Sequence, residues 1–186
     1  MKRVLEYAVI VLVAVLVALA VQAWLVKPYR IPSGSMLDTL RPGDRVLVNR
    51  MIYHLRDPHR GDVIVFHYPQ DPDVVFIKRV VGVPGDLLEV RDGHLYVNGR
   101  KVAEPYVHRT RGRADPTVAQ ATIAGGTMRD PWSLAEPYRV PVGSYFVMGD
   151  NRTDSDDSRG WGTVPRAAIV GEGLATYWPF SRLRAL

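Results

Sequence analysis

Residues 74–86 read Val-Val-Phe-Ile-Lys-Arg-Val-Val-Gly-Val-Pro-Gly-Asp, an apolar run that ends in a turn sequence. β-Branched and aromatic residues favour strands, whereas Pro, Gly and Asp favour the turns between them. A turn sequence followed by an apolar run recurs at 42–48, 60–66, 84–90 and 142–148. No stretch after residue 30 keeps a helical period, so we predict a mainly β fold with an antiparallel domain.

Two adjacent cations, Lys78 and Arg79, interrupt the apolar run. Alternation along a strand places Lys78 on the face of Phe76 and Val80, and Arg79 on the opposite face. At least one cation therefore points towards apolar neighbours. The ordinary explanation is an edge-strand lysine whose ammonium reaches water. If Lys78 is instead desolvated, its pKa falls from about 10.4 towards 7–8, and the neutral amine can take a proton from a serine.

A short turn with two serines, Ile31-Pro32-Ser33-Gly34-Ser35-Met36, lies upstream of this strand. Gly34 permits a backbone geometry in which a main-chain N–H faces a substrate. Such a triplet is usually only a polar turn, but the lysine makes Ser35 a candidate nucleophile. The five histidines lie in predicted loops or at strand ends, and Gly-x-Ser-x-Gly is absent, so nothing favours a Ser-His-Asp triad.

The first thirty residues contain a long apolar segment. Residues 7–26 would span about 30 Å as a helix, the thickness of the membrane hydrocarbon. We expect a short cytoplasmic N-terminus (1–6), a transmembrane anchor (7–26) and an extracytoplasmic catalytic domain (27–186), although the flanking cations favour this orientation only weakly. The alternative is a cleavable signal peptide, with small-x-small sites at 18–20 and 21–23.

Composition excludes several classes of protein. The chain has 186 residues, 47% of them apolar, and a formal net charge of +5. It has no cysteine, which excludes disulfides and thiolate metal sites. The basic residues form no block with interleaved aromatics, so we expect no nucleic acid partner, and the positive charge fits a surface facing anionic lipid. We also predict no metal and no cofactor. Residues 100–140 are polar and rich in turns, and we expect a less regular inserted lobe there.

A dense polar segment, Gly-Asp-Asn-Arg-Thr-Asp-Ser-Asp-Asp-Ser-Arg-Gly-Trp-Gly, occupies residues 149–162 after an apolar run. It could be a solvated turn or a calcium loop. Its four aspartates lack the alternate spacing and the final glutamate of a calcium loop, which makes calcium the weaker explanation.

Four segments, in this order after an apolar N-terminus, together resemble the bacterial type I signal peptidases. They are 32–36, 60–66, 78–86 and 149–159. Each is a weak signal alone, but four in one order are highly specific. The resemblance covers residues 30–90 and 142–165, and residues 100–140 fall where that family varies.

The resemblance implies a Ser/Lys dyad, in which Ser35 attacks the scissile carbonyl and Lys78 is the general base. It implies an oxyanion hole formed by the Ser35 N–H and the Ser33 hydroxyl. A hydrogen bond from Ser155 would orient Lys78. The other supporting residues that it implies are the ion pair of Asp157 with Arg159, and Asp150. Shallow pockets for small side chains at −1 and −3 are implied at Ile31, Pro32, Met36, Leu40, Phe76 and Ile77.

Three positions depart from the usual pattern of this family. Asp38 stands where a proline is common, and Thr153 and Asp156 differ from the commonest residues of the last segment. We expect Asp38 to loosen its turn without touching a catalytic atom. The extra carboxylate of Asp156 would favour a protonated Lys78 and move the pH optimum upward.

These observations predict a membrane-bound, monomeric serine endopeptidase of the cell membrane. Its partners would be membrane lipid and the signal peptides of exported preproteins, which it would cleave after a small-x-small site. A dedicated processing peptidase of narrow substrate range shares every motif and remains an alternative. A self-cleaving Ser/Lys repressor would need a DNA-binding helix-turn-helix, which the apolar N-terminus replaces. A non-catalytic β module displayed on the membrane is the alternative from another class.

Overall fold

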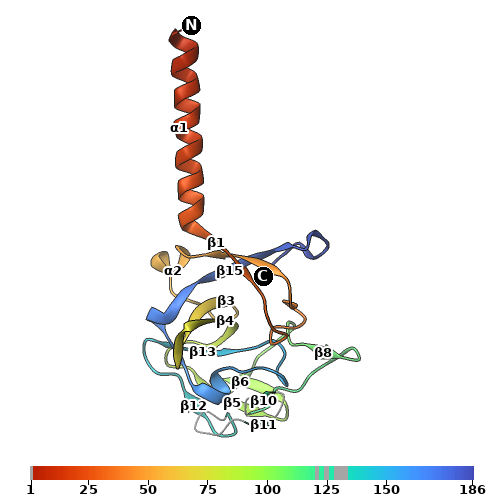
Figure 1. Cartoon of the computed structure of the whole chain (residues 1–186). Helices are drawn as coiled ribbons and strands as arrows, with labels where there is room; N and C mark the ends of the chain where they lie inside the picture. The colour runs from red at the N-terminus through yellow and green to blue at the C-terminus, as the bar shows by residue number, and fades with distance from the viewer. Residues whose placement is uncertain (1, 120–121, 124–125, 128–133) are drawn as a thin grey trace.

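The computed structural model describes residues 2–119, 122–123, 126–127 and 134–186. A single long helix, α1 (Lys2–Leu25), projects away from a body built mainly of strands (Figure 1). It begins five residues before the predicted segment 7–26, and it ends one residue earlier because Val26 already pairs with Asn49 in β1 (Val26–Arg30). Among the described residues, no helix combines the length and the hydropathy needed to cross a membrane. This finding does not support the spanning role predicted for residues 7–26.

The main sheet is antiparallel, as predicted, and has the order β1-β2-β15-β3-β4-β13-β14, with β16 paired to β15. Its other strands are β2 (Arg45–Asn49), β3 (Val63–Tyr68), β4 (Asp71–Gly82), β13 (Ser144–Met148), β14 (Val164–Pro165), β15 (Ile169–Trp178) and β16 (Arg184–Ala185). β15 follows β2 by more than a hundred residues yet lies between β2 and β3. The two ends of the chain therefore contribute adjacent strands to one sheet.

A second antiparallel sheet has the order β12-β5-β6-β7. It comprises β5 (Leu87–Arg91), β6 (His94–Val97), β7 (Arg100–Lys101) and β12 (Tyr138–Arg139). Asp92 and Gly93 join β5 to β6 with φ values of 49° and 73°, the left-handed geometry of a tight hairpin turn. The local sequence was sufficient to predict this turn.

Within residues 100–140 the strands are only two residues long. They include the hairpins of β8 (Arg109–Thr110) with β9 (Arg113–Ala114) and of β10 (Thr122–Ile123) with β11 (Gly126–Thr127). The parts of this predicted lobe at 120–121, 124–125 and 128–133 lie outside the described residues. The short helical segments of the body are α2 (Ile52–Leu55), α3 (Ser158–Trp161) and the 3-10 turns η1 (Arg166–Ala168) and η2 (Phe180–Arg182).

Strand alternation divides the apolar residues among three clusters. In β4, Val80 packs into a cluster with Phe66 and Trp161, whereas Val81 packs into another with Phe146. Residues 31–40, between β1 and β2, form an irregular turn that is called the serine turn below. A third cluster joins this turn to the sheet and contains Ile31, Met36, Leu40, Val46, Val48, Val63 and Val65. Because β3 and β4 contribute to more than one cluster, they form a rigid centre against which the serine turn is held.

Candidate active site

The structure brings Ser35 and Lys78 together although they are 43 residues apart in the sequence. Lys78 Nζ lies 2.7 Å from Ser35 Oγ. Ser35 belongs to the turn after β1, and Lys78 projects from β4. Ser33 Oγ, which the resemblance implies as an oxyanion donor, lies 3.4 Å from Ser35 Oγ. A nucleophile within hydrogen-bonding distance of a base is the geometry that acyl transfer requires.

Lys78 is buried, and only 5% of its surface is exposed. The explanation of an edge-strand lysine whose ammonium reaches water is therefore wrong. Lys78 pairs with Ile64 of β3, and the pairing of β13 with β4 begins at the next residue, Arg79. Burial lowers the pKa of Lys78 to about 8, and the negative charges of Asp157, Asp156 and Asp150 oppose that change. Near neutral pH a useful fraction of this lysine is a neutral amine.

Arg79 is buried as well, on the opposite face of β4, at 7% exposure. Its Nε and Nη2 atoms donate to the two carboxylate oxygens of Asp150, at 2.8 and 2.7 Å. Thr39, four residues after Ser35, donates its hydroxyl to the same carboxylate at 2.5 Å. Asp150, predicted as a supporting residue, thus connects β4 to the end of the serine turn. The sequence alone does not indicate these roles of Arg79 and Thr39.

The polar segment after β13 also holds the serine turn through its backbone. The Asn151 N–H donates to the Ser35 carbonyl oxygen at 3.0 Å, and Asn151 Nδ2 donates to the Gly34 carbonyl at 3.2 Å. Gly149 permits this approach, because a Cβ there would lie 2.3 Å from both the Ser35 carbonyl oxygen and Ser155 Oγ. Sequence analysis did not single out Gly149 or Asn151, although both belong to the quoted polar segment.

Asp157 and Arg159 form the ion pair that the resemblance implies. Arg159 Nε and Nη2 donate to the two Asp157 carboxylate oxygens at 2.8 and 2.7 Å, and both side chains are fully buried. The Gly149 N–H donates to the same carboxylate at 3.0 Å. Burial alone would raise the pKa of Asp157, but the Arg159 charge and these hydrogen bonds lower it overall. Asp157 is therefore a fixed negative charge beneath Lys78.

Ser155 does not make the predicted hydrogen bond with Lys78. Its hydroxyl is buried and has no partner of regular hydrogen-bond geometry within the described residues. It lies close enough to Asp157 to help lower the pKa of that carboxyl. The side-chain hydrogen bond of Lys78 Nζ is with Ser35 Oγ.

A cavity of about 350 Å³ opens beside Ser35 and Lys78. It is lined by Pro32, Ser33, Gly34, Ser35, Val74, Val75, Phe76, Ile77, Lys78, Asp154 and Asp156. Of the predicted pocket residues, Pro32, Phe76 and Ile77 line this cavity. Ile31, Met36 and Leu40 do not, because they are at most 2% exposed and pack into the core beneath the turn. The prediction that these three side chains line the cavity is therefore wrong.

The residues that depart from the family pattern have identifiable surroundings. The carboxylate of Asp38 lies 3.1 Å from His108 Nδ1 and accepts from the Arg109 N–H at 3.3 Å, so it ties the serine turn to the 100–140 region. Asp156 lines the cavity, and burial raises its pKa. Thr153 donates its hydroxyl to Asn151 Oδ1 at 3.4 Å. Among the described residues no group of three or more histidine or carboxylate side chains could hold a metal ion.

Comparisons with known proteins identify the family of this chain. The family described as signal peptidase, peptidase S26, matches residues 4–178. Signal peptidase I of Pseudomonas fluorescens is 40% identical over 91% of this chain and 72% of its own length. Signal peptidase I T of Bacillus subtilis is 35% identical over 97% of this chain and 88% of its own.

Signal peptidase IB of Staphylococcus aureus is 36% identical and covers 98% of this chain and 94% of its own length. A crystal structure of a signal peptidase I from Enterococcus faecalis aligns with 63% of this chain and 97% of its own, at 33% identity and a TM-score of 0.48. The family match spans nearly the whole sequence, including every segment that builds the serine and lysine site. The chain therefore belongs to the signal peptidase family, peptidase S26.

Proposed function

We propose that this enzyme removes signal peptides from exported preproteins through an acyl-enzyme formed on Ser35, with Lys78 as the general base. The observation that carries the proposal is the 2.7 Å approach of Lys78 Nζ to Ser35 Oγ inside a buried site. A lysine with a pKa of about 8 can accept the serine proton near neutral pH. A solvated lysine could not, since it is almost wholly protonated there.

In the first step, neutral Lys78 takes the proton from Ser35 Oγ as that oxygen attacks the scissile carbonyl carbon. The carbonyl π electrons move to the oxygen, which becomes an oxyanion. The Ser35 N–H is available to stabilise it, because this group donates to no other atom within the described residues. The Ser33 hydroxyl is the second proposed donor.

The protonated Lys78 then gives its proton to the leaving amine as the peptide C–N bond breaks. The signal peptide remains as an ester on Ser35, and the mature protein departs with a new N-terminus. Lys78, again neutral, takes a proton from water, and the resulting hydroxide attacks the ester. Collapse of this second intermediate returns the proton from Lys78 to Ser35 Oγ and releases the signal peptide.

The substrate would bind as an extended strand along β4. Among the described residues, β13 pairs with β4 only at Arg79, Val80 and Gly82, so the β4 edge opposite β3 has no paired strand before Arg79. An added strand can hydrogen-bond to such an edge. The adjacent cavity, of about 350 Å³, is apolar at Phe76 and Ile77. We propose that it accepts the small side chains at −1 and −3 that the family resemblance implies.

We also propose that the enzyme works at the membrane, with α1 in lipid and the β body on the extracytoplasmic side. Support comes from a run of large apolar side chains on α1 that the body leaves exposed, among them Ile10 at 62% and Leu12 at 58%. Membrane fractionation of the full chain, with protease protection to locate the β body, tests this part separately from the chemistry.

The decisive experiment compares cleavage of a purified preprotein by wild type, Ser35→Ala and Lys78→Ala in detergent. We expect cleavage after a small-x-small site by wild type only, located by sequencing the new N-terminus. Ser144→Ala is a matched control, because Ser144 lies on β13 and does not line the cavity. Activity in Lys78→Ala would overturn the assignment of the base. Cleavage of one preprotein out of a varied panel would favour the narrow-range peptidase.

A further inference from the structure

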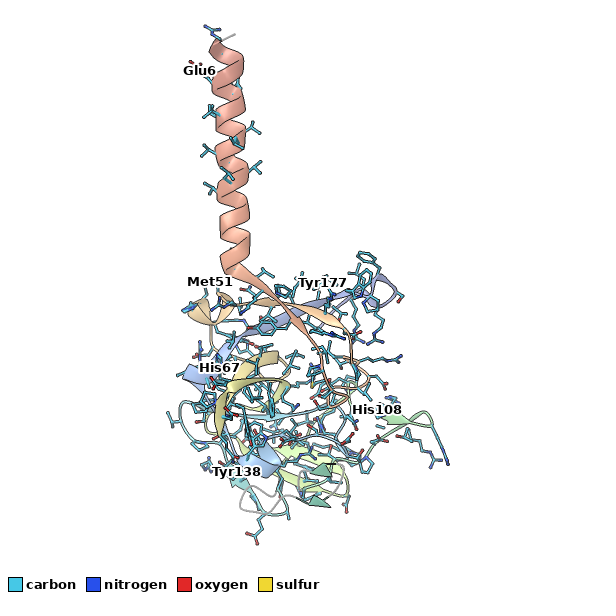
Figure 2. The ribbon with its side chains drawn as sticks, viewed as in Figure 1. Glu6, Met51, His67, His108, Tyr138 and Tyr177 are labelled. Atoms are coloured by element: carbon cyan, nitrogen blue, oxygen red, sulfur yellow. The ribbon has the colours of Figure 1, made fainter. Side chains whose placement is uncertain are left out.

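A second cavity, of about 550 Å³, lies on the side of the body from which α1 leaves. Met51, which lines this cavity, is labelled in Figure 2 at the base of α1. The lining residues belong to β1, the segment around α2, the strands β3, β4 and β15, and the 3-10 turn η1. These residues are Lys27, Tyr29, Arg50, Met51, His54, His67, Val75, Ala167, Ile169 and Val170. The basic region defined by this lining is called the basal cavity below.

The basal cavity contains basic side chains and no carboxylate. Lys27 and Arg50 carry full positive charges, and His54 and His67 add charge when protonated. Within the described part of the chain, neither Lys27 nor Arg50 forms an ion pair. Glu172 on β15 is not among the lining residues, and its carboxylate accepts from Arg56 Nη2 at 2.9 Å, while Arg56 Nη1 also pairs with Asp62. The residues that line the cavity therefore carry a net positive charge.

His67 is held in one orientation by its own backbone surroundings. Its Nδ1 lies 2.7 Å from the Pro72 carbonyl oxygen, which can only accept, so Nδ1 carries the proton. Nε2 is then the ring nitrogen left for another partner. Mutual repulsion among these basic groups is relieved most directly by a bound anion, and phosphate oxygens accept well from guanidinium and ammonium groups.

Apolar surface borders the basic groups. Met51 is 42% exposed and Val75 is 38% exposed, and Leu55 beside them at the end of α2 is 83% exposed. A free phosphate ion would use the basic groups and leave this apolar border in water. A phosphate that carries acyl chains would use both.

We propose that the basal cavity binds the phosphodiester headgroup of an anionic phospholipid, with Lys27 and Arg50 as the principal contacts. The place of the cavity supports this ligand, since Lys27 is only two residues beyond the end of α1. Val75 lines both this cavity and the catalytic cavity, so a bound headgroup would lie next to the substrate-binding edge of β4. The proposal does not depend on the chemistry assigned to Ser35 and Lys78.

The test uses the full chain in a neutral detergent and follows its histidine ring signals by NMR. The probes are short-chain phosphatidylglycerol, phosphatidylcholine with the same chains, and inorganic phosphate. We expect phosphatidylglycerol to shift the His54 and His67 signals saturably, and to bind at least tenfold more tightly than either other probe. His94, on β6, should not respond.

Charge reversal identifies the contacts. Arg50→Glu should weaken phosphatidylglycerol binding at least tenfold, and Lys27→Glu provides a second variant in case the first folds poorly. Arg100→Glu is the matched control, because Arg100 is an exposed cation on β7 outside this cavity. Equal binding of phosphatidylcholine, equal binding of inorganic phosphate, or an equal loss in Arg100→Glu would each overturn the proposal.

Discussion

Replacing Lys78 with methionine should stabilise the fold at neutral pH while removing the proposed base. The folded state lowers the pKa of Lys78 from 10.5 to about 8. The unfolded chain therefore binds this proton more tightly, and folding is disfavoured wherever the lysine is charged in the unfolded chain. The cost is fully present below about pH 8 and disappears above about pH 10.5. It amounts to roughly 3 kcal/mol at pH 7 and about 1 kcal/mol at pH 10.

The assay is guanidinium unfolding of wild type and Lys78→Met at both pH values. The substitution also changes packing, an effect that is the same at both pH values, whereas the effect of the lysine proton on stability is contained in the shift of its pKa. The advantage of the variant should therefore shrink by about 2 kcal/mol between pH 7 and pH 10. Lys101→Met is the control, because Lys101 is exposed on β7 and should show no such change. An advantage that is the same at both pH values would refute the desolvated lysine.

The remaining predictions concern catalysis and the turn. The kcat/KM of wild type should rise about tenfold from pH 7 to pH 9 and then level off, as a base with a pKa of about 8 requires, whereas a midpoint near 6.5 would indicate a histidine. In Asp156→Asn the rising limb should move to lower pH, since that carboxylate raises the pKa of Lys78; superimposable profiles would exclude this influence. Gly149→Ala should lower kcat/KM by about tenfold or more, because its Cβ would lie 2.3 Å from the carbonyl oxygen of the nucleophile, and wild-type rates would show that the approach relaxes. Asp38→Ala should change the free energy of unfolding by less than about 1 kcal/mol, because the carboxylate is half-exposed and screened; a larger loss in chemical denaturation would contradict that assessment.

The strands and turns could be predicted because their signals are local. Asp92-Gly93 between two apolar runs determines a hairpin within a few residues, and the structure has it. The start of β1 could not be predicted from local sequence in the same way. Apolar residues continue through Val26, but pairing with Asn49, far along the chain, makes Val26 a strand residue.

The site was predictable only where family resemblance added information to the local pattern. Alternation indicated that Lys78 faces apolar neighbours, but not that Ser35 lies opposite its amine. The resemblance also led to an error in the pocket. Ile31, Met36 and Leu40 belong to an irregular turn, where no period tells an exposed side chain from a buried one, and all three are in the core.

Lys78 and Arg79 show why burial alone does not make a base. Both cations lie on β4, and both side chains are nearly inaccessible to water. Arg79 forms an ion pair with the Asp150 carboxylate at 2.7 Å, and this charged pair links β4 to the serine turn. Among the described residues no carboxylate lies within ion-pair distance of Lys78, whose nearest polar partner is the Ser35 hydroxyl. The Asp157 charge that would otherwise hold the lysine proton is committed to Arg159. Burial lowers the pKa of Lys78, and the lack of an ion-pair partner among the described residues lets that effect prevail.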